Sequence, residues 1–182
     1  MPSLKTIVEG LLFVSDQALS LEKLAEIIED GSGPEGVGRA IEELNAEYAL
    51  ADRAFSIREV AEGFQLRTRL DLAPYALRLK RNTPAKLSKA ALETLAVIAY
   101  RQPVLRAEIE KIRGVDAGGI IKTLLDKELI RISSRRESLP GRPMLYSTTH
   151  KFLETFELTD LASLPTIDEL DNITPPSEAR LF

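Results

Sequence analysis

The chain has 182 residues, of which 44% are hydrophobic and 29% are charged, and its formal net charge is −4. It has no cysteine and a single histidine, His150. This composition excludes disulfides, thiolate metal sites and histidine clusters. With no apolar run of about 20 residues, we expect a cytoplasmic protein. Because the usual catalytic and metal-binding residue types are few, we also expect no catalytic residues, cofactor or metal.

Three helices are predicted in the first 50 residues. Ser3 can cap a helix whose apolar residues recur at helical spacing from Leu4, and Ser20 can cap a second helix. A third helix is predicted from about Pro34 to Leu50. The loop before it, residues 31–36, matches the spacing of a dinucleotide-binding loop, but a helix rather than a strand precedes it, so we interpret it as an ordinary connection.

The apolar period then changes from helical to alternating. Phe55–Val60 and Phe64–Thr68 predict two short strands, with a hairpin turn at Glu62-Gly63. Three helices followed by a hairpin are typical of a winged helix. A further helix, from Asp71 to about residue 80, is predicted to close this unit, with Pro74 in its first turn.

The same pattern then starts again. A helix capped by Ser88 runs to about Tyr100, and it is apolar nearly all round, so we expect it to be central. Helices over 106–113 and from Asp116 follow, and then two strands, 129–133 and 144–148, joined by a polar loop.

The predicted fold class is mainly α with small β-hairpins (α+β), as two tandem winged-helix domains. We expect the first domain at residues 1–80, a linker at 81–87 and the second domain at 88–160. An acidic tail over 161–182 is expected to be partly disordered because it thins into Thr174-Pro-Pro-Ser177.

Charge is distributed unevenly along the chain. Residues 1–80 carry a net charge of −5, residues 86–151 carry +6 and residues 152–182 carry −6. The positive segment can attract nucleic acid or an acidic partner. The alternative is that the acidic tail or an acidic neighbour neutralises it internally.

Direct DNA binding needs a suitable third helix in one of the two units. The first candidate displays Glu42, Glu43 and Glu47, which repel phosphate, and the second begins with Gly118-Gly119. Because neither helix suits base contacts, a winged-helix transcription regulator or nucleoid protein that acts directly on DNA is only the second hypothesis for the function. Its candidate non-specific phosphate contacts are in the second wing: Arg135, Arg136 and Arg142.

Several stretches resemble one known family, segregation and condensation protein B. The most specific lie in the second half, and others lie in the opening helices and the first hairpin: Ser88–Pro103, Arg106–Asp116, Pro140–Thr149, Glu9–Val14, Leu19–Ala25 and Gly63–Arg69. The resemblance covers roughly residues 4–160.

The resemblance implies a non-enzymatic homodimer, formed through the first domain. It also implies that the dimer binds the kleisin subunit (segregation and condensation protein A) of the bacterial SMC complex, which condenses and segregates chromosomes. The protein would then be associated with the nucleoid, and DNA would be contacted weakly or through the SMC ATPase. No membrane or small-molecule partner is implied.

Residues for these contacts can be suggested from spare apolar positions. Off the main helical stripes, Phe13, Val14, Leu50 and Phe55 are candidates for the dimer interface; the alternative is that the helix over 71–80 covers them. For the kleisin, the exit of the helix over 88–100 is the candidate: Tyr100, Arg101 and Gln102. The alternative is that Tyr100 and Arg101 only pack and cap the second domain.

Overall fold

The computed structural model describes residues 2–79, 87–166 and 169. The chain divides into two compact units. Unit 1 takes its described residues from Met1–Thr83 and Glu157–Asp160, and unit 2 from Pro84–Phe156 and Leu161–Phe182. Within the described residues, no helix is long and apolar enough to span a membrane.

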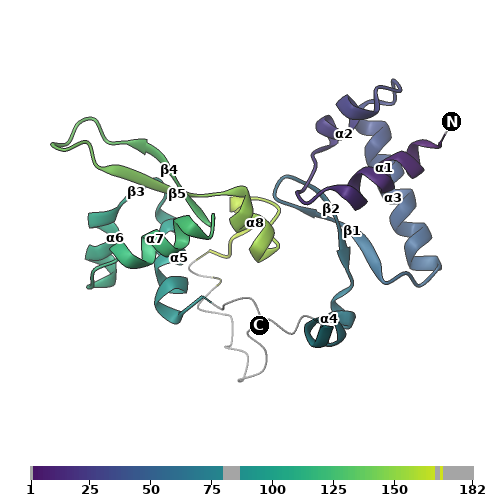
Figure 1. Ribbon diagram of the computed structural model, residues 1–182. Coiled ribbons are helices and arrows are strands. Elements are labelled where there is room, and N and C mark those ends of the chain that lie inside the picture. Colours follow the sequence, from purple (N-terminus) through teal and green to yellow (C-terminus); the bar gives the residue numbers. More distant parts are fainter. Residues whose placement is uncertain (1, 80–86, 167–168, 170–182) are drawn as a thin grey trace. The chain divides into compact units, whose positions relative to one another are not determined.

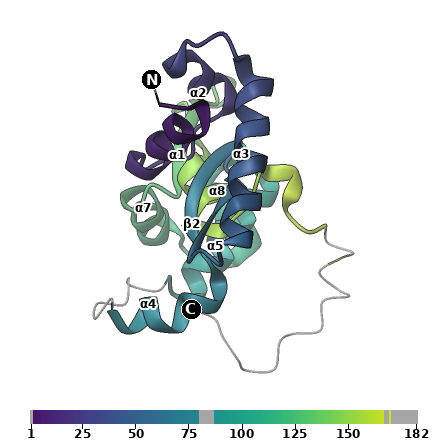
Figure 2. The same ribbon diagram turned by 90° about the vertical axis from the view of Figure 1, so that its right-hand side faces the viewer.

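Unit 1 is built on three helices, α1 (Leu4–Val14), α2 (Leu21–Ile28) and α3 (Gly33–Leu50). The predicted caps are confirmed, because the hydroxyls of Ser3 and Ser20 accept hydrogen bonds from the N–H groups three residues on, each at 3.2 Å. Both α1 and α2 pack against α3 (Figures 1 and 2). The core consists of Val8, Leu12, Leu24, Val37, Ala40, Ile41, Leu44, Tyr48 and Ile57.

The first hairpin pairs β1 (Phe55–Val60) with β2 (Gly63–Thr68). Its turn is Ala61-Glu62, one residue before the predicted Glu62-Gly63, and both turn residues have positive φ, 50° and 57°. Positive φ at both central residues is typical of the two-residue turns that match the twist of a hairpin. The glycine belongs to the strand instead.

Gly63 is required by a close approach of two backbones. A Cβ at this position would lie 2.8 Å from the carbonyl carbon of Leu19. Next to it, Leu19 and Phe64 exchange two backbone hydrogen bonds, at 3.0 and 2.8 Å. The absence of a side chain therefore lets the segment before α2 join the edge of the wing.

After β2 the chain forms a short 3₁₀ turn, η1 (Leu70–Leu72), and then α4 (Ala73–Leu79). The single helix predicted from Asp71 thus begins as 3₁₀, and its expected end at residue 80 lies outside the described residues. None of the side chains of α4 is buried, and Leu79 is 84% exposed. A helix of seven residues is marginal on its own, so α4 needs a surface to pack on.

Unit 2 repeats the arrangement with α5 (Lys89–Arg101), α6 (Arg106–Arg113) and α7 (Gly118–Asp126). The predicted Ser88 cap is confirmed. The expectation that α5 is central is confirmed, because it packs against α6, α7 and β5, although Leu92 and Ala96 are exposed on one side. Asp116 accepts a hydrogen bond from the N–H of Gly118, at 3.0 Å, although the cap residue of α7 is Ala117.

The sheet of unit 2 has the order β3-β5-β4, formed by β3 (Val104–Leu105), β4 (Ile130–Arg135) and β5 (Met144–Thr148). The two-residue strand β3 is not predicted by the sequence. The pairing of β4 with β5 shifts between Ile132 and Ser134, which leaves Ser133 as a bulge. The Ser133 hydroxyl donates to the Leu145 carbonyl at 3.2 Å, so the bulge is held by a hydrogen bond of its own.

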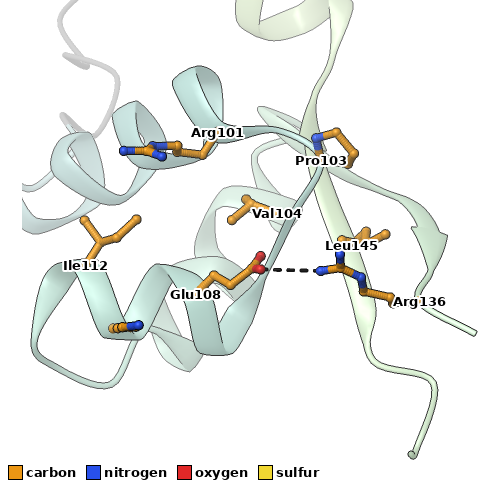
Figure 3. Close-up of a pocket in the computed structure, with 8 residues that line it drawn as sticks. Arg101, Pro103, Val104, Glu108, Ile112, Arg136 and Leu145 are labelled. Carbon is orange, nitrogen blue, oxygen red and sulfur yellow. Dashed lines mark hydrogen bonds and ion pairs between the residues drawn. The ribbon is translucent and has the colours of Figure 1, made fainter. Parts of the chain in front are cut away.

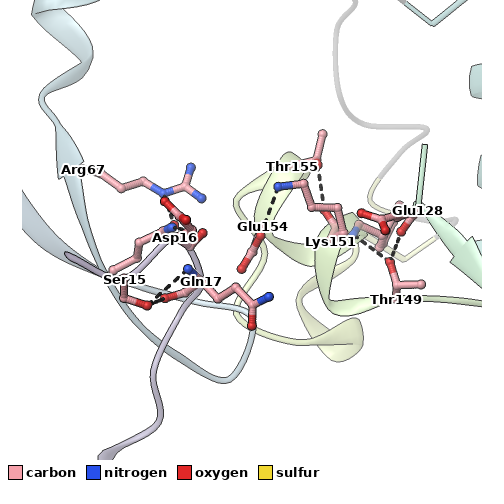
Figure 4. Close-up of polar contacts among 11 residues, drawn as sticks. Ser15, Asp16, Gln17, Arg67, Glu128, Thr149, Lys151, Glu154 and Thr155 are labelled. Atoms are coloured by element: carbon pink, nitrogen blue, oxygen red, sulfur yellow. Dashed lines mark hydrogen bonds and ion pairs between the residues drawn. The ribbon is translucent and has the colours of Figure 1, made fainter. Parts of the chain in front are cut away.

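Unit 2 continues with α8 (His150–Phe156) and the short η2 (Leu161–Ser163). The Thr149 hydroxyl accepts from the Phe152 N–H at 3.2 Å and donates to the Glu128 carbonyl at 2.5 Å (Figure 4). One residue thus caps α8 and ties it to the end of α7. His150 is an exposed residue at the start of this helix, and among the described residues no cluster of His, Cys, Asp or Glu has the grouping to hold a metal.

Candidate partner-binding groove

An open groove of about 640 Å³ lies in unit 2, between the end of α5, β3, α6 and the wing formed by β4 and β5 (Figure 3). Its residues come from four separate stretches of the sequence, which the fold brings together. They are Arg101, Pro103, Val104, Glu108, Lys111, Ile112, Arg136 and Leu145.

The groove combines an apolar floor with a charged rim. Ile112 is 53% exposed, although it lies on a helix whose inward residue, Ile109, is fully buried. Val104 is buried beneath the groove, and Leu145 is half-buried. An exposed isoleucine beside buried apolar residues offers contact area that water covers in the free chain.

The rim carries three cations and one anion: Arg101, Lys111, Arg136 and Glu108. Glu108 is already satisfied, because its carboxylate accepts from the Leu105 N–H at 2.9 Å and lies 3.4 Å from a guanidinium nitrogen of Arg136. Within the part of the chain that the structure describes, neither Arg101 nor Lys111 has an ion-pair partner. The rim therefore has an excess of positive charge.

The α6 wall of the groove is fixed by a nearly buried arginine. The side chain of Arg113 is 13% exposed, and its guanidinium donates to the Ala90 carbonyl at 2.7 Å and to the Thr94 hydroxyl. It also pairs with Glu93 at 2.7 Å. These bonds join the end of α6 to the start of α5, so the wall has a defined position.

The connection from α6 to α7 is held by a second ion pair. Arg106 donates to the carboxylate of Asp116, just before α7, at 2.6 Å, and within α6 it also donates to the Glu110 carboxylate at 2.6 Å. This hydrogen bond, and after it the one from the Ala117 N–H, lowers the pKa of the Glu110 carboxyl. The charged carboxylate is thus the form that the fold favours at neutral pH.

Of the three residues suggested for partner contact, Arg101 alone lies in the groove. The Tyr100 hydroxyl donates to the Pro165 carbonyl at 2.6 Å, while the residue as a whole is 41% exposed. Gln102 makes its hydrogen bonds inside unit 2, because its side-chain oxygen accepts from the N–H and the hydroxyl of Thr148 at 2.8 and 3.0 Å. It fixes the α5 exit to β5.

The suggested dimer residues have different surroundings. Phe13, Val14 and Leu50 are exposed, and Leu50 at the end of α3 is 90% exposed, so α4 does not cover them. Phe55 instead packs edge-on against Tyr48, with ring centroids 4.9 Å apart. The sequence analysis did not identify further exposed apolar residues in η1 and α4. The signal for them in the sequence was the high proportion of apolar residues in these two elements. They are Leu70, Tyr75, Leu77 and Leu79.

Polar residues of α3 make hydrogen bonds and ion pairs within unit 1. Asn45 exchanges two hydrogen bonds with the backbone of Ile57, at 3.0 and 2.8 Å, and Lys5 pairs with Glu43 and Glu47. Burial, and then the hydrogen bond to Glu9, raises the pKa of the Tyr48 phenol, so the neutral form is kept.

The start of α7 is also unsuited to reading bases. It begins with Gly118 and Gly119, which have no side chains, and a Cβ at Gly118 would displace only the end of the flexible Arg106 side chain, 2.7 Å away. Arg135 and Arg142 of the second wing are exposed. With α3 acidic, and with α7 carrying Lys122 as its single basic residue and no Arg, Asn or Gln, sequence-specific DNA binding is disfavoured.

Comparison with known proteins gives consistent matches along almost the whole chain. The model of a family described as segregation and condensation complex subunit ScpB matches residues 6–167. Segregation and condensation protein B of Syntrophotalea carbinolica is 48% identical over 179 residues, which cover 98% of this chain and 89% of that protein.

Solved structures are also similar. The crystal structure of ScpB from Mycobacterium tuberculosis has 35% sequence identity, covers 86% of this chain and 96% of that chain, and has a TM-score of 0.40. A structure described as a dimer of the ScpB N-terminal domain complexed with a ScpA peptide has 34% identity, covers 41% of this chain and 91% of that chain, and has a TM-score of 0.38.

Proposed function

The chain belongs to the family of segregation and condensation protein B, and from this membership we propose that it is a non-enzymatic subunit of the bacterial SMC–kleisin complex. In that complex it forms a homodimer and binds the kleisin, segregation and condensation protein A. Through the kleisin it supports the SMC ATPase in condensing and segregating chromosomes. It acts in the cytoplasm, associated with the nucleoid, and contacts DNA weakly or indirectly.

The observation that carries this proposal is the extent of the family match. It spans residues 6–167 and therefore includes both units. Purification of the tagged chain from its own cells tests it. We expect the kleisin to stay bound through a high-salt wash, because the interface has an apolar component that salt does not screen. Loss of the kleisin together with retention of a defined DNA sequence at physiological salt would favour a DNA-binding regulator.

We assign dimerisation to unit 1 (domain 1–80). Its support is the exposed apolar side chains at the ends of α1 and α3, among them Phe13, Val14 and Leu50. A standard interface buries about 800 Å² on each partner, and exposed apolar residues of this kind supply its centre.

The double variant Phe13→Asp with Val14→Asp is expected to convert the dimer to a monomer, because it places two like charges in each half of a self-complementary interface. Mass measured in solution should fall from twice 20.2 kDa to 20.2 kDa. The control is Ile27→Asp, at an exposed apolar position of α2, which should leave the dimer intact. A double variant that stays dimeric at the same protein concentration would move the interface to another surface.

We assign the kleisin contact to unit 2 (domain 88–160), at the exit of α5. The double variant Tyr100→Ala with Arg101→Ala is expected to weaken kleisin binding by about 2 kcal/mol, roughly 30-fold, since it removes an aromatic contact and a charged hydrogen-bond donor. Titration calorimetry measures the affinity, and thermal melts show whether the fold is kept. Lys127→Ala, at the exposed end of α7, is the control.

Two results would contradict this assignment. Normal binding by the double variant would place the contact on another surface, unit 1 included. Loss of binding only with a collapsed melting temperature would mean that Tyr100, through its hydrogen bond to Pro165, has a structural role. Tyr100→Phe separates these effects, because it removes that hydrogen bond and keeps the ring.

A further inference from the structure

We propose that a cleft on unit 1, between the last turns of α3 and the outer edge of β1, binds the phosphate group of a small molecule (Figure 1). The cleft has a volume of about 360 Å³, which is within the usual range of small-molecule sites. The proposal goes beyond the proposed function, because it concerns neither the kleisin nor the dimer.

The charge of the cleft identifies an anion as its ligand. Arg53, Arg58 and Arg69 line it, and none of the described residues that line it carries a carboxylate. Arg69 is held in place by Asp52, at 2.5 Å, and by Asp71, at 2.7 Å, which neutralise it. Within the described part of the chain, Arg53 and Arg58 have no ion-pair partner. Two guanidinium groups are therefore available to an incoming anion, and their planar array of donors matches a phosphate group.

A backbone N–H adds a further donor to the cleft. The side chain of Asn45 bonds both the N–H and the carbonyl of Ile57, so these two backbone groups point away from β2 and toward α3. Along a strand of an antiparallel pair, every second residue directs its backbone groups to the same side. The N–H of Phe55, two residues earlier, therefore also points to the α3 side, and Phe55 lines the cleft.

The same contact excludes an extended peptide as the ligand. A strand added to the outer edge of β1 would need the backbone groups of Ile57, and Asn45 already occupies both of them. A compact group can instead use the Phe55 N–H and the two arginines without displacing an existing bond.

The surroundings favour a small molecule over a nucleic acid. Asp52, Glu59 and Asp71 are exposed next to the arginines that line the cleft. A DNA duplex would bring a row of phosphates against these carboxylates, whereas a single phosphate group needs to approach only the arginines. The half-buried ring of Phe55 gives the cleft an apolar side, so the rest of the ligand can be aromatic.

The probe is adenosine monophosphate, titrated into the full-length chain at about 0.05 M NaCl and followed by calorimetry and by amide NMR. We expect a dissociation constant of about 0.1–1 mM, with the largest shift changes at the amides of Phe55 and its neighbours. Inorganic phosphate should compete with the nucleotide. Adenosine, which has the same base and no phosphate, should cause no change.

Two variants test the arginines. Arg53→Gln and Arg58→Gln should each weaken binding about tenfold, because each loses a hydrogen bond to a charged group. Both side chains are exposed, so the fold tolerates the changes. The control is Arg39→Gln, at an exposed arginine of α3 that does not line the cleft, and it should change the affinity by less than about twofold.

Four results would overturn the proposal. The first is no binding of the nucleotide at about 10 mM, and the second is equal binding of adenosine. The third is unchanged affinity in both arginine variants. The fourth is a DNA duplex that binds more tightly than the nucleotide at equal phosphate concentration and is lost in both variants, which would make the cleft a contact for the DNA backbone. Each result leaves the proposed function standing, because kleisin binding is measured separately.

Discussion

Replacing Ile109 with alanine is expected to lower the free energy of unfolding of unit 2 by about 2–5 kcal/mol. Ile109 is fully buried on the inner side of α6. Truncation removes apolar contacts and leaves a cavity that the surrounding helices fill only in part. Urea unfolding followed by circular dichroism measures the change as a shift in the midpoint.

The control lies three residues away on the same helix. Ile112 is 53% exposed, so Ile112→Ala should change the stability by about 0.5 kcal/mol or less. Equal stability losses would show that the two isoleucines share one environment, contrary to the structure.

A second large loss is expected from Gly63→Ala, at the first residue of β2. The added methyl group would lie 2.8 and 2.9 Å from the carbonyl carbon and oxygen of Leu19, and these are backbone atoms that no rotamer change can move. The wing and the segment before α2 must separate, at a cost of about 3 kcal/mol. Thermal and urea unfolding of unit 1 measure this cost.

Gly10→Ala tests whether loss of a glycine alone explains the effect. Gly10 lies inside α1, and no atom is within 4 Å of an added Cβ. Alanine loses less conformational entropy than glycine in a helix, so this variant should be more stable than the wild type by about 0.5–1 kcal/mol. A Gly63→Ala variant as stable as the wild type would mean that Leu19 and Phe64 are not paired in solution.

Much of the fold could be predicted from local chemistry. Ser3, Ser20 and Ser88 begin helices because each precedes an apolar stripe at helical spacing, and all three hydroxyls cap as expected. The first hairpin turn was misplaced because Gly63 is also the residue type of a turn. Its actual reason, room for Leu19, depends on a residue 44 positions earlier and is not visible in local sequence.

The site could be predicted only in part. Arg101, which lines the groove, could be named because it ends a capped helix, and a helix exit is a local feature; its contact with a partner stays a prediction. Glu108, Lys111, Ile112 and Arg136 form one groove with it because α6 and the wing fold back toward α5. The exposure of Ile112 could not be predicted either, since its spacing from Ile109 is that of two residues on one buried face.

The adjacent pair Arg135 and Arg136, just beyond the bulge at Ser133, gives the second wing a form of redundancy. If β4 paired with β5 without the bulge, every residue beyond Ile132 would slip by one position, and its side chain would change faces. Arg135 would then take the face that Leu145 and Arg136 now share beside the groove. Because the two arginines are adjacent in the sequence, one guanidinium lies on the groove side whether or not the bulge is present. The positive charge beside the groove is therefore the same in both pairings.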